Sequence, residues 1–484
     1  MNNLGKRPLG NSTTVLDLAD RDEMDDDMFP LSSEKSWFTR DTNRRCLNYS
    51  TVIQEFVHKG SAEFGGRLVF EIGSVKACDL LLSVVLQIKL GHWLSPSVIE
   101  NIQNGTYTYA NPSAAWFYAN SLGTALIAKA EFLLEDQVLE TVDGDFSNLF
   151  SLLFPDVNTQ FGVAADGTGR VSTSQLLTWN PNRFFPTSNG FISCILPFSF
   201  QRIRARNGFP LLSCKEGTVR IALTLRPFSE CVRIASGVRA TCNETPLGKS
   251  FVFNVQGGGT QTVVASSTVP QFNDVRLITY GSLLDGKLRQ ACLRVPFDRL
   301  FREVQIFKFT EPIKYIDTVT SNDTVRLQLP IEVNGPVEEI LWFIRRKAVS
   351  LNNEWNNYSN RIESEYNSIY RPFESMLVYG RIQVNGSPLI EAEGDYFRRD
   401  AAKRHRGGIV AYDNFAYGYC FAQSPGLQNP SGWINASRTS DVRLRLDIRP
   451  PGGSQDLEFE VAVYSISLNW VRFENGIANK VFSS

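Results

Sequence analysis

Histidine is the residue that most often combines metal binding with acid–base chemistry, and this sequence has little of it. Its three histidines, His58, His92 and His405, lie far apart in the chain. A metal site on neighbouring β-strands needs two or three histidines together with a carboxylate. His92 ends an apolar stretch, which favours a structural role. The histidines therefore predict no metal site.

The cysteines are equally scattered, and none has the Cys-x-x-Cys spacing of a zinc or redox motif. They are Cys46, Cys78, Cys194, Cys214, Cys231, Cys242, Cys292 and Cys420. Reduced and mostly buried thiols are the expectation for such a set.

Two charged stretches are the remaining candidates for chemistry. Glu391, Glu393 and Asp395 could supply the acid and base of a glycosidase, although carboxylates in loops are usually only solvated. The basic run at 398–406, RRDAAKRHR, is typical of a solvated loop, or of a contact with an acidic neighbour such as residues 25–27. The aromatic residues that would favour single-stranded nucleic acid are not interleaved with it.

Sequence motifs for nucleophilic or phosphate chemistry are missing as well. No Gly-x-Ser-x-Gly or P-loop pattern occurs, and a β-like run, not a helix, follows the glycine triplet at 257–259. We predict that the protein is not an enzyme and has no catalytic, cofactor-binding or metal-binding residue.

The composition describes an ordinary globular protein of more than one domain. The chain has 484 residues, of which 43% are apolar, and its formal net charge is −1. This length exceeds what one core normally serves, and the charge provides no general attraction to nucleic acid. No apolar run approaches 18 residues and the first residues lack a signal-peptide core, so we expect synthesis in the cytosol without standard secretion.

Alternation of apolar and polar residues predicts an all-β protein. It is clearest at 82–90, 325–333, 376–384 and 457–463. After Val463 the apolar residues change phase, which indicates a bulge or a strand buried on both faces. Helical spacing is confined to short segments near 296–304 and 352–366.

An internal repeat organises the chain. Residues 219–227 read VRIALTLRP and residues 442–450 read VRLRLDIRP, and each strand ends at a proline that cannot continue a ladder. A fainter pair, RLVFEI at 67–72 and RLQLPI at 326–331, precedes them in the same order. Two copies of one β-domain are therefore predicted.

The repeat suggests the domain limits. The first copy runs over 47–228 and the second over 229–484, with 235–270 as a linker carrying its own hairpin or as an extended surface loop. Further long loops are expected at about 155–190 and 387–408. Residues 1–46 are polar and acid-rich and form an N-terminal arm, partly disordered or contacting neighbours.

Several stretches resemble the major capsid proteins of nucleocytoplasmic large DNA viruses. In the first copy these are GTALIAKAEFLLEDQVLETVDGDF (123–146), LPFSF (196–200) and GFPLLSC (208–214). In the second they are NGPVEEILWFIRRK (334–347) and FAYGYCFAQSPGLQNPSGWINASR (415–438), the most specific stretch. The resemblance covers most of 47–484 and excludes the arm.

The resemblance implies a fold of two tandem eight-stranded antiparallel jelly-roll sandwiches, a double jelly roll. It implies a structural major capsid protein that forms homotrimeric, pseudo-hexameric capsomers and tiles the icosahedral shell of a large double-stranded DNA virus. The implied partners are the chain itself, neighbouring capsomers, and minor capsid and internal membrane proteins on the inner face, with no direct nucleic-acid contact. The location implied is the virion, after assembly in host cytoplasm or a viral factory.

Alternatives remain at this stage. One is a transient double jelly-roll scaffold on a viral membrane, and another is a minor or penton capsid component. A third is a jelly-roll carbohydrate-binding protein or enzyme, which would show a pocket with convergent carboxylates or an exposed aromatic platform.

Overall fold

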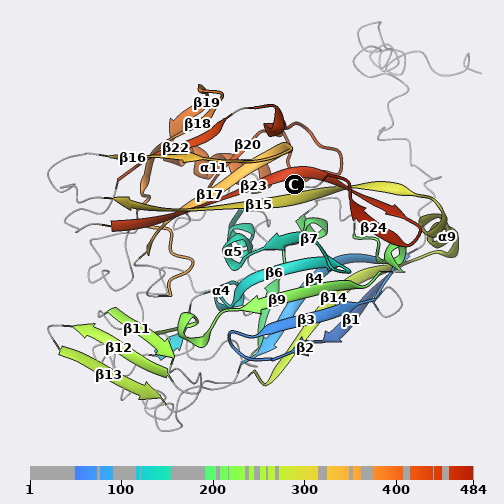
Figure 1. The fold of residues 1–484 in the computed structure, drawn as a ribbon, viewed down its shortest axis with the longest axis horizontal. Coiled ribbons are helices and arrows are strands. Elements are labelled where there is room, and N and C mark those ends of the chain that lie inside the picture. Colours follow the sequence, from blue (N-terminus) through green and yellow to red (C-terminus); the bar gives the residue numbers. More distant parts are fainter. Residues whose placement is uncertain are drawn as a thin grey trace, which may run out of the picture. The chain divides into compact units, whose positions relative to one another are not determined.

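Antiparallel strands make up most of the structure, a computed structural model (Figure 1). It describes residues 49–73, 77–90, 116–119, 121–153, 191–202, 208–215, 217–234, 239–244, 251–257, 260–266, 272–313, 324–347, 353–360, 374–406, 415–439, 441–449 and 457–482. The predicted arm at 1–46 and the predicted loop at about 155–190 lie outside these residues. No helix in the described part of the chain has the length and apolar character needed to cross a bilayer.

The first sandwich packs two antiparallel sheets around a core of alternating apolar side chains. One sheet has the order β1-β14-β4-β8, with bounds Tyr49–Val57, Asp274–Leu284, Leu80–Lys89 and Phe191–Ile195. The other has the order β2-β3-β9-β6-β7, with bounds Lys59–Gly60, Arg67–Ile72, Val219–Leu225, Ile127–Leu134 and Gln137–Val142. Phe132 of β6 packs against Phe198 and Phe209, which joins the strands to the segments between them.

The second sandwich has the same plan. Its first sheet has the order β15-β23-β17-β20, with bounds Phe297–Ile313, Leu457–Glu474, Pro336–Arg346 and Tyr417–Cys420. Its second has the order β16-β22-β18-β19, with bounds Val325–Pro330, Val442–Ile448, Leu377–Val384 and Ser387–Glu393. Short strands β21 (Ile434–Asn435) and β24 (Ile477–Lys480) extend the first of these sheets.

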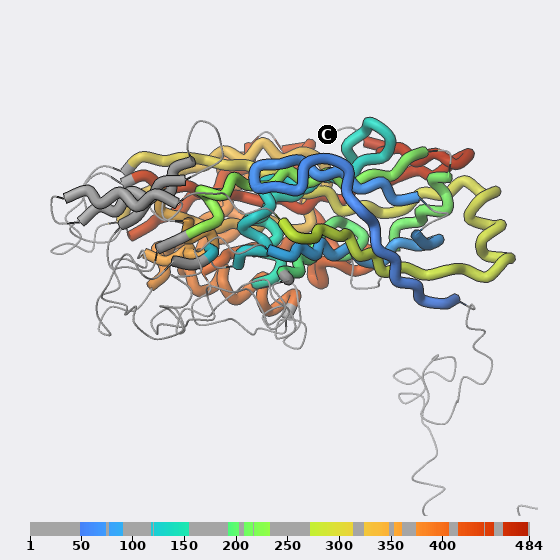
Figure 2. Tube along the Cα trace, turned by 90° about the horizontal axis from the view of Figure 1, so that it is seen from below, coloured from blue at the N-terminus to red at the C-terminus, as the bar shows by residue number. Residues whose placement is uncertain are grey.

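Short helices and turns fill the connections. The α-helices are α4 (Leu122–Ala125), α5 (Gly144–Leu153), α8 (Ser199–Arg202), α9 (Gly286–Arg294) and α11 (Gly394–Arg406). The 3-10 turns are η3 (Leu211–Cys214), η4 (Phe228–Glu230) and η6 (Ala436–Arg438), and β5 (Trp116–Tyr118) pairs with β10 (Val232–Ile234). Helix α9 connects β14 to β15 at the right-hand edge of both overall views (Figures 1 and 2).

The repeated strands occupy corresponding places in the two sandwiches, as the sequence predicted. Val219 begins β9 opposite Ile72 on one side and Leu134 on the other. Val442 begins β22 opposite Val384, and its carbonyl accepts the N–H of Ile331. The fainter pair at 67–72 and 326–331 thus lies beside the stronger pair in the same register in both copies. The predicted double jelly-roll class is confirmed.

The limit between the sandwiches differs from the prediction. The sequence assigned everything after residue 228 to the second copy, yet β14 is hydrogen-bonded between β1 and β4 of the first. A jelly roll needs its last strand to return beside its first, so the first sandwich extends to Leu284. Within the predicted linker at 235–270, β11 (Arg239–Glu244), β12 (Phe251–Gly257) and β13 (Thr260–Ser266) form a separate antiparallel sheet.

Two local expectations were wrong. Residues 296–304 were expected to be helical, but all except the first lie within β15, which pairs with β23 along its whole length. Residues 387–408 were expected to form a loop, but they contain β19 and then α11, which buries Phe397, Ala401 and Ala402. The secondary structure of these segments is determined by cross-strand pairing and by burial of one helix face, and not by the local sequence alone.

The change of phase after Val463 reflects burial on both faces. Residues 461–469 of β23 are all buried, and their pairing with β15 continues without a bulge. In β17, residues 337–346 are all buried as well. One face of this sheet covers the core of the second sandwich. The other face is therefore available to contact the first sandwich.

Candidate functional site: the junction between the two sandwiches

The junction is where residues of the first sandwich meet the doubly buried strands β17 and β23. Arg345 of β17 is its centre, with a side chain that is 1% exposed. Its Nη1 and Nη2 donate to the two oxygens of Asp145 at 2.8 and 3.2 Å, and Nη2 also donates to Glu460 at 2.8 Å. A buried bidentate pair of this kind fixes both distance and orientation.

Helix α5 presents Asp145 because its first turn is capped by the preceding residue. The Asp143 carboxylate accepts the N–H of Phe146 at 2.7 Å, the usual arrangement at a helix N-terminus. The same carboxylate accepts the Tyr464 hydroxyl at 3.1 Å and pairs with Lys308 at 2.8 Å, both in the second sandwich. One capping residue therefore serves both its helix and the junction.

A second cluster of buried charged residues lies along β15. Arg302 donates from Nε and Nη2 to Glu338 at 2.6 and 3.0 Å, and its side chain is 2% exposed. Its backbone N–H donates to the Ser199 hydroxyl at 2.8 Å, and its carbonyl accepts Arg202 of the first sandwich. Arg202 is paired in turn with buried Glu140 at 2.6 Å.

The electrostatics follow from these contacts. Burial alone would raise the pKa of Asp145, but Arg345, Arg226 and Lys308 outweigh it and hold that pKa below its ordinary value. Burial opposes the charge of Arg345, yet Asp145 and Glu460 leave its pKa raised. Both groups are therefore ionised at neutral pH, and separating the sandwiches would remove the pairing of Asp145 with Arg345.

A turn before β18 adds further contacts across the junction. The Asn353 side chain donates to the carbonyls of Ser229 and Val232 at 2.6 and 2.8 Å. The indole of Trp355 donates to the carbonyl of Glu230 at 2.9 Å, and Arg226 stacks on its ring at 3.7 Å. Residues 353–360, in one of the segments expected to be helical, instead form turns that join the two halves.

The junction residues were not predicted from the sequence. Glu338, Glu339, Arg345 and Arg346 stand within 338–347, whose other residues are mostly apolar. Four charges inside one apolar run are the signal that could have indicated a buried ionic contact.

The acidic residues considered for a glycosidase are not brought together as an acid and a base. Glu391 pairs with Arg381, and these contacts lower its pKa. Asp395 pairs with Arg398 at 3.0 Å within α11. The basic run is the body of this helix, and His405 near its end contacts buried Glu339. His92 lies outside the described residues.

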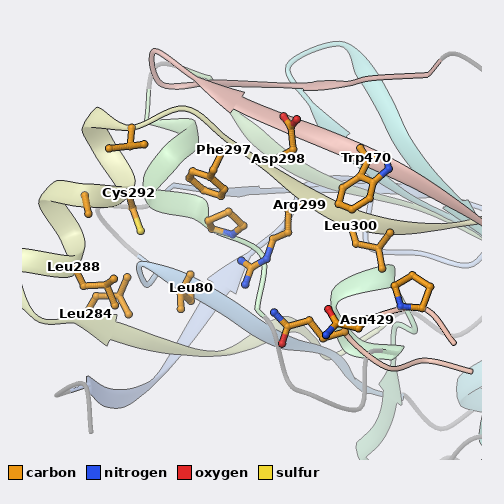
Figure 3. Close-up of a pocket in the computed structure, with 15 residues that line it drawn as sticks. Leu80, Leu284, Leu288, Cys292, Phe297, Asp298, Arg299, Leu300, Asn429 and Trp470 are labelled. Atoms are coloured by element: carbon orange, nitrogen blue, oxygen red, sulfur yellow. The ribbon is translucent and has the colours of Figure 1, made fainter. Parts of the chain in front are cut away.

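A pocket of about 540 Å³ lies beside α9 (Figure 3). Leu284, Leu288, Cys292 and Trp470 are among its mostly apolar lining residues. Its single carboxylate, Asp298, is held by Arg472 at 2.8 Å, and Arg299 donates to the carbonyl of Gly208 at 2.5 Å. The pocket therefore lacks the convergent carboxylates that a glycosidase would require.

Comparison with known proteins identifies the family. The family described as "Large eukaryotic DNA virus major capsid protein" matches residues 290–479, and the one described as "Major capsid protein N-terminus" matches residues 36–258. The chain belongs to the major capsid proteins of large DNA viruses. The match to the N-terminal family ends at residue 258, and the other begins at residue 290, within α9, where the structure passes from one sandwich to the other.

A curated relative and two solved structures agree with this family. The major capsid protein of Chrysochromulina ericina virus is 21% identical over 347 residues, 66% of this chain and 55% of the relative, so the chain spans just over half of that protein. The PBCV-1 virus capsid has a TM-score of 0.64 at 15% identity, covering 93% of this chain and 100% of the other. The Faustovirus major capsid protein has a TM-score of 0.63 at 10% identity, covering 96% and 97%. These structures share the double jelly-roll fold.

Proposed function

We propose that this protein is the principal shell subunit of a large double-stranded DNA virus, and that it acts as a homotrimer. Membership of the family supports the shell role. The trimer is supported by one observation, which is that the two sandwiches within one chain have matching strand orders. Three copies present six similar sandwiches, and a ring of six can be surrounded by others edge to edge, as an icosahedral surface requires.

The contact between copies would be heterologous and close after three steps. Obligate interfaces of this kind bury on the order of 2,000 Å² or more and contain apolar residues. Strand β1 is a suitable surface, because it lies at the edge of its sheet and exposes Tyr49, Ile53 and Val57 by 63%, 60% and 78%. Exposed apolar edge strands are usually covered by a partner in the assembled state.

The remaining partners follow from the shell role. We propose neighbouring capsomers as lateral partners, and minor capsid and internal membrane proteins on the inner face. The protein would be located in the virion after assembly in the host cytoplasm. A structural function, not catalysis, agrees with a junction whose buried polar groups bond to one another.

Light scattering after size exclusion tests the trimer. The full chain should elute with a mass about three times 54.3 kDa. Ile53→Lys should shift the mass toward the monomer with unchanged circular dichroism, because it places a charge in the proposed contact. Leu389→Lys, at an exposed apolar position on β19 in the other sandwich, is the matched control. A wild-type chain that stays monomeric at working concentration would contradict the proposal.

A further inference from the structure

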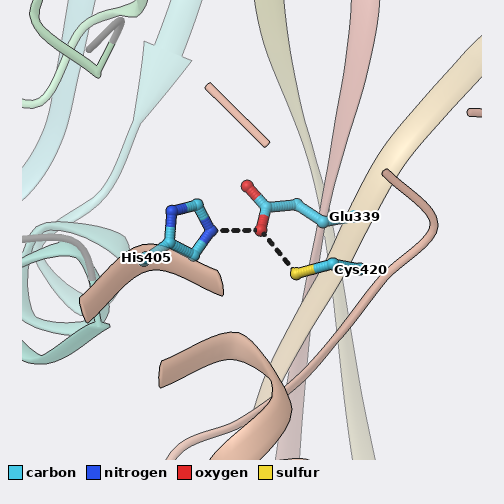
Figure 4. A group of neighbouring side chains, drawn as sticks. All are labelled: Glu339, His405 and Cys420. Carbon is cyan, nitrogen blue, oxygen red and sulfur yellow. Dashed lines mark hydrogen bonds and ion pairs between the residues drawn. The ribbon is translucent and has the colours of Figure 1, made fainter. Parts of the chain in front are cut away.

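Three side chains that commonly bind metals converge in the second sandwich, outside the junction (Figure 4). Glu339 of β17 and Cys420 of β20 are directly opposite in the ladder, and their Oε2 and Sγ atoms are 3.4 Å apart. His405, in the last turn of α11, places Nε2 at 2.6 Å from the same oxygen. All three ligand atoms lie within 4.8 Å of one another.

The three side chains of this cluster are buried. The side chains of His405 and Glu339 are each 2% exposed, and Cys420 is 3% exposed. Burial opposes ionisation of Glu339, but His405 and the Cys420 thiol lower its pKa, so it is a carboxylate that accepts both hydrogen bonds. Burial and the Glu339 charge raise the pKa of Cys420 well above its usual range, so the thiol is protonated in this state.

A carboxylate, an imidazole and a thiol form a donor set suited to Zn²⁺. Zinc bonds of about 2.0 Å to oxygen and about 2.3 Å to sulfur place these two atoms roughly 3.5 Å apart in a tetrahedral site. The observed separation of 3.4 Å between Glu339 and Cys420 matches this value. Bonds of about 2.0 Å from zinc to oxygen and nitrogen place those two atoms roughly 3.3 Å apart, so the 2.6 Å between Nε2 of His405 and Oε2 of Glu339 would have to increase by less than an ångström.

We propose that Glu339, His405 and Cys420 form a binding site for one Zn²⁺ ion per chain. The metal would bond to Oε2, Nε2 and Sγ, with water in the fourth position. Binding releases the thiol proton, and the imidazole would bind the metal through Nε2 as the neutral tautomer that carries its proton on Nδ1. The two positive charges of the ion meet a carboxylate and a thiolate, so the buried cluster is neutral after binding. This proposal departs from the sequence-based expectation of no metal site.

A neighbouring carboxylate orients the cysteine of the cluster. Asp400 accepts the backbone N–H of Cys420 at 3.2 Å and pairs with Arg404 at 3.4 Å.

The first sandwich contains a natural control for this site. Cys194 of β8 lies opposite Leu86 of β4, in the strands that correspond to β20 and β17. Cys194 is buried as deeply as Cys420, but its strand partner offers no ligand atom, and its thiol contacts the Ile195 carbonyl. The duplicated fold thus holds one cysteine with metal-binding neighbours and one without.

Cobalt binding to the full chain, stripped of metal with a chelator, provides the test. Co²⁺ should bind with one equivalent per chain and give a thiolate charge-transfer band in the near ultraviolet. Zn²⁺ should displace the Co²⁺. Binding of Zn²⁺ to the metal-free chain should release at least one proton per ion at neutral pH, measured by calorimetry in buffers of different ionisation enthalpy. Cys420→Ser keeps a hydroxyl donor to Glu339, and it should abolish the band and weaken Zn²⁺ binding at least about a hundredfold. Cys194→Ser should retain both.

A wild-type chain that shows no band, or a Cys420→Ser chain that binds Zn²⁺ as tightly as wild type, would overturn the site. If Cys420→Ser does not fold, alkylation of the wild-type chain decides instead, because bound Zn²⁺ should slow the modification of Cys420 and leave that of Cys194 unchanged. Equal rates at Cys420 with and without Zn²⁺ would count against the proposal. These measurements are independent of the capsid role, since oligomeric mass is read separately.

Discussion

Arg345 shows how a single side chain can join two domains. It contributes hydrogen bonds to Asp145 in the first sandwich and to Glu460 in the second, with all three groups largely removed from water. A buried ion pair gains little over a well-packed apolar contact, but removing one partner leaves the other charge unpaired at high cost. The value of such a residue lies in specifying one arrangement of the two halves.

We predict that Arg345→Met destabilises the protein by about 3–5 kcal/mol, because it leaves Asp145 and Glu460 without their main partner. The unfolding midpoint in guanidinium chloride measures the effect. Arg472→Met is the control, since its pair with Asp298 is exposed and should contribute little. Equal midpoints for the two variants would show that the junction does not depend on this arginine.

At the scale of elements, the two copies share a helix start that lies outside the sequence repeat. After each strand hairpin a helix begins with Gly-Asp, at Gly144 in α5 and at Gly394 in α11. A side chain on Gly144 would overlap the carbonyl oxygens of Thr124 and Ile127, and one on Gly394 would overlap that of Leu377. Both glycines allow the helix to start close against the backbone of its own sandwich.

Gly144→Ala and Gly394→Ala should therefore each destabilise the fold by about 1–3 kcal/mol, the usual range for overpacking a closed site. Thermal unfolding followed by circular dichroism provides the comparison. Gly286→Ala, at the first residue of α9 with open space around it, should be neutral or slightly stabilising. Destabilisation by Gly286→Ala alone would contradict this account of the helix starts.

The sequence was sufficient to predict the strands that have one buried face. In β16 and β22 apolar and polar residues alternate, and the buried ones are those expected, such as Leu327, Leu329, Leu444 and Leu446. It failed for α11, whose seven charged residues conceal the helical spacing of Phe397 and Ala401. It also failed for β15, where Phe297, Phe301 and Val304 have helical spacing but pairing with β23 imposes a strand.

The junction and the proposed zinc site were beyond sequence reasoning for a different reason. Asp145 and Arg345 are 200 residues apart, and Glu339 and His405 are 66 apart. Their meeting depends on how one sandwich packs on the other, or how a helix packs on a sheet edge. Periodicity describes which face of an element is buried, and it carries no information about which element covers that face.

At the scale of the whole molecule, the chain divides into a β-unit beginning at Tyr49 and the preceding 48 residues. The pairs that join the sandwiches all lie within the β-unit. The predicted arm at residues 1–46 has no core-forming pattern, so we propose that its role is in contacts made during assembly and not in folding.

Deletion of residues 1–46 should leave the unfolding midpoint and the trimeric mass unchanged while reducing the yield of closed shells in cells that produce virus. Electron microscopy of purified particles and light scattering of the truncated chain measure the two properties. An internal deletion within the glycine triplet at 257–259, away from the arm, is the control for a change in chain length. A truncated chain that no longer folds would assign the arm to a sandwich.

The doubly buried strands β17 and β23 have a geometric consequence for any surface built from this protein. Hinging the sandwiches would break the buried contacts of Arg345 with Asp145 and of Arg202 with the Arg302 carbonyl, so the two halves of each chain should move as one body. A closed surface built from such chains would bend along the seams between molecules.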